Sequence, residues 1–423
     1  MTTDTELRLL PSAVPVTNCR SCGDHRLQEF LSLGSTPIAN ALLAPADSIE
    51  PDPSYPLVVG VCETCALVQV MHELPAEVIF GAEYPYFSSF SDQLVRHSRA
   101  HVEELVATRR LGPDSLVVEI ASNDGYLLRE FAPHGVPVLG VEPTPGPAAA
   151  ARESGVDTIE EFFGIGLGRR LRAERGAADV VLAKNVMAHV PDLNGFVAGM
   201  AALVAEDGIV QVENPGLPAL LDHAEFDTVY HEHFCYFSTI AVQRLFARHG
   251  LVLLDVEQFP GLHGGTLRWT AGTRGMPSKR ARAQLDAERA AGLDGTAVYT
   301  GFGLRVIQLQ HELRSLLRRL RAEGATIAAY GAAAKGATLL NSSGIGANLI
   351  DFVVDRNPHK QGRLMPGARL PILDPSALLE RRPDYVVLLA WNVAEEVVAQ
   401  QRAYTDAGGR FIVPVPKPRI LGS

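Results

Sequence analysis

Four cysteines near the N-terminus constrain this chain more than any other feature of its sequence. They form two C-x-x-C pairs, Cys19 with Cys22 and Cys62 with Cys65. Each pair brings two sulfur atoms onto one tight turn, and four thiolates are a tetrahedral ligand set that Zn2+ prefers. Because a closed four-cysteine site leaves no open position for a substrate, we expect a structural zinc ion that stabilises a small domain. The alternative is a group of buried or reactive thiols, such as a redox dithiol.

Composition and charge narrow the class of protein. The chain has 423 residues, enough for two or three domains, and its five cysteines are too few for a disulfide scaffold. A formal charge of −10 argues against a nucleic-acid-binding protein, because such proteins carry basic faces. The first residues lack the pattern of a signal peptide, and the longest apolar runs have only strand length. We therefore expect a cytoplasmic monomer without a membrane segment.

The order of apolar runs predicts three domains, at residues 1–90, 91–275 and 276–423. The first is rich in Pro, Cys and turn residues, and a helical pattern begins near residue 93. In the other two, strand-length runs alternate with helix-length segments, which is typical of an α/β sheet with parallel strands. The runs 251–259 and 266–272 are close enough in sequence to form an antiparallel pair. The parallel strands are expected at 115–121, 136–142, 179–185, 208–214, 326–331, 349–355, 384–391 and 409–416.

The first strand of the middle domain ends in a turn of small and polar residues, EIASNDGY (119–126). Such a turn before a helix lets backbone N–H groups approach a ligand, and a carboxylate at the end of the next strand can bind both ribose hydroxyls. The turn lacks the G-x-G-x-x-G fingerprint, which weakens NAD and favours S-adenosylmethionine in a class I methyltransferase domain; a generic nucleotide-binding α/β domain is the alternative. The expected cofactor-binding residues are Glu119, Ala121, Asn123, Asp124, Gly125, Tyr126, Glu142, Asn185 and His189. A helix cap at Asn185 and a packed or solvated His189 are the structural alternatives.

A dense group of titratable side chains lies in the segment YHEHFCYFS, Tyr230–Ser238. A histidine near its reference pKa of about 6.5 can take a proton at neutral pH, while a glutamate orients it and a tyrosine supplies a hydrogen bond. We therefore expect a general-base site. Two alternatives are a His-x-His metal site, for which no further carboxylate ligands are evident, and a turn of packed aromatic residues.

The third domain contains the turn YGAAAKG (330–336) between a strand and a helix. It is not a dinucleotide fingerprint, but a helix N-terminus with Lys335 nearby suits the pyrophosphate of a nucleotide sugar. We expect His263 and Trp391 to line the same cleft. The structural alternatives are a surface lysine, a buried histidine in a turn and a tryptophan in the core.

Taken in order, these motifs resemble one family of proteins. They are the two cysteine pairs, EYPYFSS (83–89), EIASNDGYLL (119–128), GVEPT (140–144), NVMAHVPD (185–192), YHEHFCYFS (230–238), HGGTLR (263–268), YGAAAKG (330–336) and KQG…PG…PI (360–372). The family is that of the three-domain, zinc-containing, S-adenosylmethionine-dependent sugar C-methyltransferases, which act on dTDP-linked 4-keto-deoxysugars in antibiotic biosynthesis. The match runs from Cys19 to about Pro416.

The resemblance implies an architecture and a set of roles. It implies a zinc-bearing N-terminal domain, a central Rossmann-like cofactor domain and a C-terminal Rossmann-like domain that helps to hold the nucleotide sugar. His233 is then the general base, supported by Tyr230 and Glu232. Tyr84 and Tyr86 belong to the active-site tyrosine region of the family, and the sequence does not say which of them faces the substrate.

The expected reaction follows from the weak nucleophilicity of carbon. A carbon atom attacks a methyl sulfonium only after it has lost a proton, and a neighbouring ketone delocalises the resulting charge on oxygen. With His233 as the base, Tyr230, Tyr84 or His231 would donate hydrogen bonds to the enolate oxygen. A 4-keto group activates both C-3 and C-5, so we expect methylation at C-3 with C-5 as the alternative. An NAD-linked or non-catalytic nucleotide-binding protein with a zinc module is the second class of function.

Overall fold

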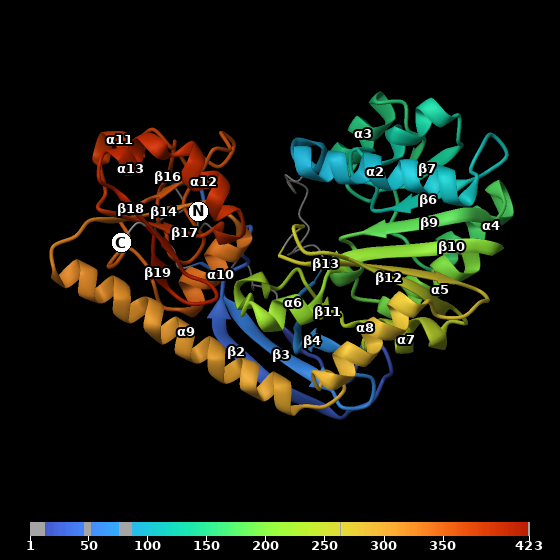
Figure 1. Cartoon of the computed structure of the whole chain (residues 1–423), viewed down its shortest axis with the longest axis horizontal. Coiled ribbons are helices and arrows are strands. Elements are labelled where there is room, and N and C mark those ends of the chain that lie inside the picture. Colours follow the sequence, from blue (N-terminus) through green and yellow to red (C-terminus); the bar gives the residue numbers. More distant parts are fainter. Residues whose placement is uncertain (1–12, 46–51, 76–86, 263, 422–423) are drawn as a thin grey trace, which may run out of the picture.

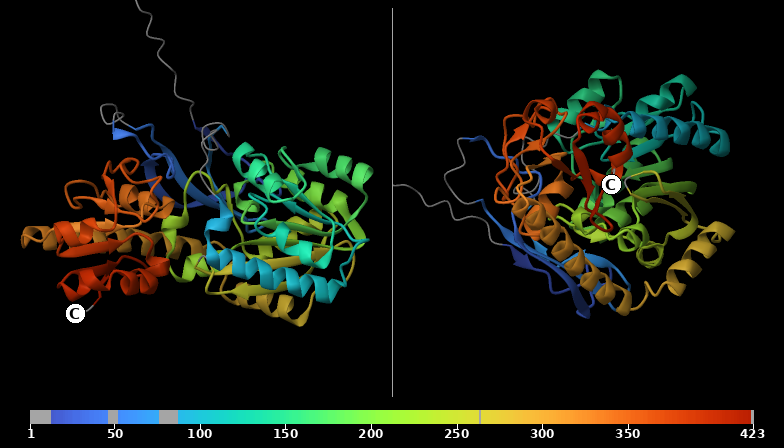
Figure 2. Two further views of the ribbon diagram at one scale, coloured as in Figure 1. Left: turned by 90° about the horizontal axis from the view of Figure 1, so that it is seen from above. Right: turned by 60° about the vertical axis from the view of Figure 1, so that its left-hand side comes forward.

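The computed structural model describes residues 13–45, 52–75, 87–262 and 264–421 (Figure 1). Three sheets of four or more strands are arranged along the molecule. Figure 2 shows the strands of the N-terminal part between the central and the C-terminal parts of the chain. Within the described ranges, every helix is too short or too polar to cross a membrane.

The largest sheet has seven strands in the order β12-β13-β10-β9-β6-β7-β8. All neighbouring pairs are parallel except those of β13, which runs antiparallel to both β10 and β12. The predicted antiparallel pair is therefore confirmed, and β13 lies inside the sheet rather than at its edge. The strands are β6 (Val117–Ile120), β7 (Val138–Val141), β8 (Thr158–Ile159), β9 (Ala178–Lys184), β10 (Val204–Pro215), β12 (Val252–Phe259) and β13 (Thr266–Gly272).

Helices cover both faces of this sheet, so its central strands are apolar on both sides. Val180 and Leu182 point to the face covered by α2 (Asp92–Arg109) and α3 (Pro145–Glu153). The alternate residues Val181 and Ala183 belong to the core on the opposite face. That face is covered by α4 (Ile165–Arg175), α5 (Leu193–Leu203) and α7 (Thr239–Arg248). The strand order first reverses at β6, and the crevice at the carboxyl ends of β6 and β9 is where open α/β sheets bind ligands.

The N-terminal sheet contains a strand from elsewhere in the chain. Its order is β11-β4-β3-β2, where β2 is Leu27–Thr36, β3 is Tyr55–Cys62, β4 is Val68–Val70 and β11 is Cys235–Tyr236. Cys235 pairs with Gln69 and Tyr236 with Val68. The segment expected to carry the base is thereby attached to the cysteine-bearing sheet. A separate two-stranded pair joins β1 (Val14–Pro15) to β5 (His72–Glu73).

The C-terminal sheet has the order β16-β15-β14-β17-β18-β19, parallel except for β19. Its strands are β14 (Ile327–Tyr330), β15 (Val353–Val354), β16 (Ile372–Leu373), β17 (Tyr385–Leu388), β18 (Arg410–Val413) and β19 (Arg419–Ile420). Its helices are α10 (Ala334–Ser342), α11 (Ala377–Arg381), α12 (Ala394–Gln400) and α13 (Arg402–Asp406). A second Rossmann-like sheet is confirmed.

Two helices connect the central and C-terminal sheets. The shorter, α8 (Lys279–Ala290), packs on β12, and the long α9 (Ala297–Ala322) runs along β2 of the N-terminal sheet (Figure 1). At the closest approach, a Cβ on Gly303 would lie 2.1 Å from the carbonyl oxygen of Phe30, so only glycine fits there. All three parts of the chain are thus packed together around the N-terminal sheet.

Candidate active site and zinc site

The four cysteines of the two pairs converge at one point. Their sulfur atoms all lie within 4.8 Å of one another, with 3.4 Å between Cys19 and Cys65 and 3.5 Å between Cys22 and Cys62. Zn–S bonds of about 2.3 Å require sulfur–sulfur edges of roughly 3.8 Å in a tetrahedron, whereas a disulfide bond is about 2.05 Å long. The donor set and its spacing therefore fit a zinc ion and not a disulfide.

Both cysteine pairs have the same local backbone. The N–H of Gly23 donates to the carbonyl of Cys19 at 2.9 Å, and the N–H of Ala66 donates to the carbonyl of Cys62 at 2.8 Å. These two residues follow their pairs directly and are left-handed, with φ of 74° and 61°. Cys19 and Cys65, one from each C-x-x-C pair, share a hydrogen bond between their thiols. This bond lowers the pKa of Cys65 to about 5 and raises that of Cys19, so the Cys65 sulfur ionises readily.

We call the turn at residues 119–126 the cofactor turn, after its expected role. In it, residues with a left-handed backbone alternate with residues of ordinary conformation. Ala121, Asn123 and Gly125 have φ of 54°, 52° and 73°. At Gly125 a Cβ would meet a side-chain carbon of Val156 at 3.0 Å. The N–H of Asn123 donates to the carboxylate of Glu142 at 3.0 Å, which ties the turn to the end of β7. Strained backbone of this kind is concentrated at ligand-binding sites.

Several described side chains at or just after the ends of β6 and β9 carry unsatisfied polar atoms. One oxygen each of Glu119, Asp124 and Asn185 is buried and has no hydrogen-bond partner among the described residues. Burial raises the pKa of Glu119 to about 8, against the opposing effect of the nearby Lys184 charge. Tyr126, by contrast, packs in the core with α2. The free oxygens are suited to a ligand that donates hydrogen bonds.

The left-handed Ala121 leads to a prediction. An alanine in this conformation costs roughly 1 kcal/mol more than a glycine, because its Cβ crowds the following carbonyl. We expect Ala121→Gly to keep S-adenosylmethionine affinity within about threefold, and Ala121→Val, whose branched side chain cannot adopt this backbone without strain, to weaken it at least tenfold. Isothermal titration calorimetry measures both. Equal affinities for the two variants would show that the backbone conformation at this residue does not matter for the cofactor.

His233 lies in the turn before β11, and a contact with a backbone carbonyl orients its ring. Nδ1 is 3.0 Å from the carbonyl oxygen of Thr228. A carbonyl can only accept, so Nδ1 carries the proton and Nε2 has a free lone pair. Burial and the neighbouring His189 lower the pKa of His233 well below its ordinary value, which keeps the ring neutral at pH 7. The chemistry of a general base is therefore available at Nε2.

Aromatic rings surround this imidazole. The ring of Tyr230 lies 4.0 Å from that of His233, and His189 meets it edge-on at 4.7 Å. Tyr236, not expected from the sequence as a site residue, lies at 6.0 Å with its hydroxyl buried. Burial lowers the pKa of His189 to about 4, so this ring is also neutral.

The structure corrects the expected orientation of two side chains in this segment. Glu232 does not orient His233: its buried carboxylate accepts two hydrogen bonds, of 2.8 and 3.0 Å, from the amide of Asn40 in the N-terminal domain. Burial raises the pKa of Glu232 to about 7. The ring of His231 points to β3, where Nε2 lies 3.3 Å from the carbonyl oxygen of Tyr55. His231 and Glu232 both face the N-terminal domain, whereas the ring of His233 faces Thr228 of the central domain, so His231 is separated from the imidazole of His233.

The predicted substrate residues of the third domain lie against the central domain. Nζ of Lys335 lies 4.7 Å from the ring centroid of Trp391, a cation–π contact. The same ammonium donates to the side-chain oxygen of Asn392 at 3.0 Å. Nε1 of Trp391 donates to Asp227 of the central domain at 2.6 Å. Of the other predicted residues, Tyr84, Tyr86 and His263 lie outside the described residues.

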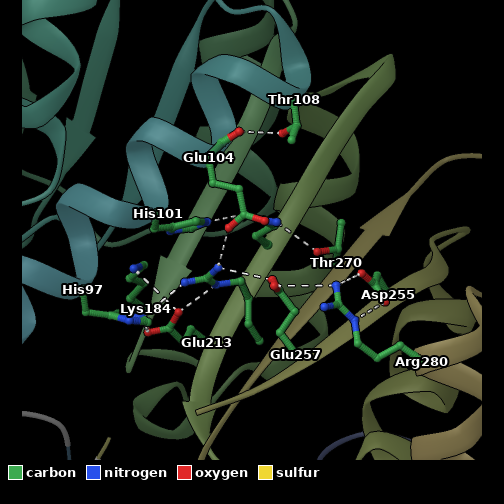
Figure 3. A network of polar contacts seen from close by, with 12 residues as sticks. His97, His101, Glu104, Thr108, Lys184, Glu213, Asp255, Glu257, Thr270 and Arg280 are labelled. Atoms are coloured by element: carbon green, nitrogen blue, oxygen red, sulfur yellow. Dashed lines mark hydrogen bonds and ion pairs between the residues drawn. The ribbon is translucent and has the colours of Figure 1, made fainter.

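Beside the crevice lies an ionic network that the sequence analysis did not predict (Figure 3). Glu213, at the end of β10, contacts His97 and Arg268 at 2.9 Å and Lys184 at 3.6 Å. Burial opposes ionisation of Glu213, but Lys184 and these neighbours together lower its pKa. Arg268 also contacts Glu104 and Glu257, which line a hollow of about 260 Å³ that contains none of the predicted site residues. Contacts between strands distant in sequence create this network, so no local motif marks it.

Comparisons with known proteins show which protein families and solved structures this chain is similar to. Residues 19–80 match a zinc binding domain family, residues 94–256 a methyltransferase domain family and residues 261–416 the C-methyltransferase C-terminal domain family. Over 412 residues the chain is 37% identical to C-methyltransferase NovU of Streptomyces niveus, covering 97% of this chain and 98% of that protein. Among solved structures it is similar to magnesium protoporphyrin IX methyltransferase of Synechocystis with bound SAH, at 14% identity and a TM-score of 0.34 over 42% of this chain and 82% of that one. A methyltransferase of Clostridium acetobutylicum aligns at 11% identity and a TM-score of 0.35, over 43% of this chain and 92% of that one.

The sheet order of the central domain, together with its family match, defines an S-adenosylmethionine-dependent methyltransferase. The four-cysteine site of the N-terminal domain is its zinc site. Because the identity to a C-methyltransferase extends over nearly the whole chain, this protein belongs to the C-methyltransferase family. An NAD-linked or non-catalytic protein, the second class left open by the sequence, is thereby set aside.

Proposed function

We propose that the enzyme methylates a dTDP-linked 4-keto-deoxysugar at the carbon next to the ketone, C-3 in preference to C-5, through an enolate formed by His233. The observation that carries this proposal is the 3.0 Å contact between Nδ1 of that residue and the carbonyl oxygen of Thr228. Its Nδ1–H is committed to the carbonyl of Thr228, so Nε2 is available to accept a proton. A methyltransferase acting on oxygen or nitrogen has less need of such a base, since those atoms already carry lone pairs.

The cofactor crevice supports the binding of a cationic methyl donor. S-adenosylmethionine, when bound, supplies an electrophilic methyl group on a positively charged sulfur. Asp124 presents a buried side-chain oxygen that lacks a partner among the described residues, and Glu119, whose raised pKa favours the neutral carboxyl, presents a second. Glu142, directly after β7, would accept hydrogen bonds from the ribose hydroxyls, the role expected of an acidic residue at this place in the fold.

In the mechanism that we propose, residues of the central domain handle the proton. Nε2 of His233 removes the proton from the carbon next to the ketone, and the positive charge on the ring is stabilised by the carbonyl that Nδ1–H contacts. Tyr230, whose ring lies against the imidazole, would donate a hydrogen bond to the enolate oxygen. Tyr84 remains a second candidate donor. The base then releases its proton to solvent.

The C-terminal domain supports recognition of a nucleotide. Lys335 and Trp391 lie where β14 and β17 end, the place at which doubly wound sheets bind ligands. A lysine beside a helix N-terminus is suited to a diphosphate. NovU, the relative of the whole chain, carries a C-methyltransferase name, and that name is consistent with carbon as the acceptor.

The proposal is tested by incubating the zinc-loaded enzyme with S-adenosylmethionine and a dTDP-4-keto-deoxysugar. We expect a product that is heavier by one methyl group in mass spectrometry. A matched dTDP-sugar with a 4-hydroxyl in place of the ketone should give no product, because its neighbouring carbon is not acidic. Equal methylation of both sugars would contradict an enolate mechanism.

A further inference from the structure

One short turn of the central domain contacts both the base and the C-terminal domain. This turn, η5 (Phe226–Thr228), is followed closely by the segment that carries His233. The carbonyl of Thr228 holds the imidazole at 3.0 Å. One residue earlier, the carboxylate of Asp227 accepts the hydrogen bond from Trp391 at 2.6 Å. The contact with the C-terminal domain and the contact with the base are therefore adjacent on the same turn.

Asp227 is buried more completely than a carboxylate normally is. The exposed fraction of Asp227 is 0%, and its second carboxylate oxygen has no hydrogen-bond partner among the described residues. Burial raises its pKa to about 6, against the opposing charge of Lys335. A buried carboxylate that depends on one neutral donor is strongly tied to the position of that donor.

Local contacts hold this turn, which links the position of Asp227 to that of its neighbour Thr228. Phe226 is fully buried in the core. The side chain and the N–H of Thr228 both donate to the carbonyl of Glu225, at 2.7 and 3.1 Å. Gly264 packs against Glu225, the residue before the turn. The packing is so close that a Cβ on Gly264 would lie 2.5 Å from the carboxylate of Glu225.

We propose that Asp227 is a positioning residue that couples the ligand crevice of the C-terminal domain to the orientation of His233. The nature of the ligand, a nucleoside diphosphate sugar, rests on the proposed function. A diphosphate that engages Lys335 and a nucleotide that seats against Trp391 fix the indole that holds Asp227. The base is therefore oriented best when the nucleotide half of the substrate is bound.

The test removes the indole donor and keeps an aromatic ring. In Trp391→Phe we expect kcat to fall about tenfold, since one hydrogen bond to a buried carboxylate is lost, while the Kd of S-adenosylmethionine changes less than twofold. Trp269→Phe is the matched control, because Trp269 is the other tryptophan of the chain and donates to Thr239 in the core of the central domain. It should lower the melting temperature and leave kcat within about twofold. A higher KM with unchanged kcat in Trp391→Phe would reduce its role to binding and overturn the proposal.

A second set of variants isolates the link through Asp227. Asp227→Asn keeps an acceptor for the indole and should retain most of kcat, whereas Asp227→Ala should lose about as much as Trp391→Phe. The double variant should be no worse than either single one, as expected for residues that act through one contact. Additive losses would contradict the coupling.

A spectroscopic measurement separates this proposal from the identity of the substrate. The Nδ1–H proton of His233 should give an NMR signal that exchanges slowly with solvent, assigned by its absence in His233→Asn. In Trp391→Phe that signal should shift and exchange faster, and in Trp269→Phe it should not. If no keto sugar is methylated, the proposed function fails while this result still tests the link. An unchanged signal in Trp391→Phe would refute the link even in an active enzyme.

Discussion

His233→Asn is expected to lower kcat about a thousandfold, because a general base contributes between about 10² and 10⁴ to a rate. The asparagine amide can replace Nδ1–H as the donor to Thr228 but offers no equivalent of Nε2. The turn should therefore keep its shape while the proton acceptor is lost. Steady-state kinetics with the keto sugar measure the loss.

Two further measurements distinguish loss of the base in His233→Asn from loss of cofactor binding. The Kd of S-adenosylmethionine should stay within about twofold of the wild type, and the substrate should no longer exchange the proton next to its ketone for deuterium in D2O. His101→Gln is the control, since this buried histidine is not one of the proposed site residues and the glutamine amide can keep its contact with Gln211. A His233→Asn enzyme that still exchanges this proton at the wild-type rate would remove the residue from the role of base.

The second large effect is expected from loss of the zinc site. In Cys62→Ser, a fully buried ligand is replaced by a poor one, and we expect zinc content near zero and a melting temperature lower by ten degrees or more. Structural zinc contributes about 10–16 kcal/mol to the folding of small zinc-binding peptides, more than a small domain can otherwise supply. Atomic absorption and differential scanning calorimetry give the two values.

Activity should be lost together with zinc, although the metal lies outside the chemistry. Arg20, between the first two cysteines, lies over the ring of Phe234 at 5.0 Å, and β4, which follows the second pair, holds β11 in the sheet. Unfolding of the cysteine-bearing turns therefore frees the segment next to His233. Cys235→Ser is the matched control, because this buried thiol lies outside the four-cysteine cluster. A zinc-free Cys62→Ser enzyme with normal kcat would contradict a structural role for the metal in the active site.

The sequence predicted those features that depend on local patterns. Alternating apolar runs located the strands of both α/β sheets, and the spacing of Cys19, Cys22, Cys62 and Cys65 predicted the zinc ligands, because both signals are contained in short segments. The same kind of signal marked the turn at 119–126, whose part in cofactor binding stays a prediction. Its left-handed backbone at Ala121 was not foreseen, since alanine rarely adopts that conformation.

Features that depend on long-range packing could not be read from the sequence. The segment 230–238 was recognised by its composition, but pairing of β11 with β4 directs Glu232 to Asn40 instead of His233. Asp227 has no motif around it, and its contact with Trp391 joins positions that are 164 residues apart in the chain. Glu213 and Arg268 likewise come together only when β10 and β13 pair. In each case the role of the side chain depends on which distant residue it contacts, and its residue type alone does not reveal that contact.

The position of the transferred methyl group tests the central claim most directly. The enzyme is incubated with S-adenosylmethionine carrying a 13C-labelled methyl group and a dTDP-4-keto-deoxysugar, and the product is examined by NMR. We predict that the labelled methyl is bonded to the carbon adjacent to the C-4 ketone, at C-3. A methyl group on oxygen or nitrogen, or on a carbon that is not adjacent to the ketone, would contradict the account.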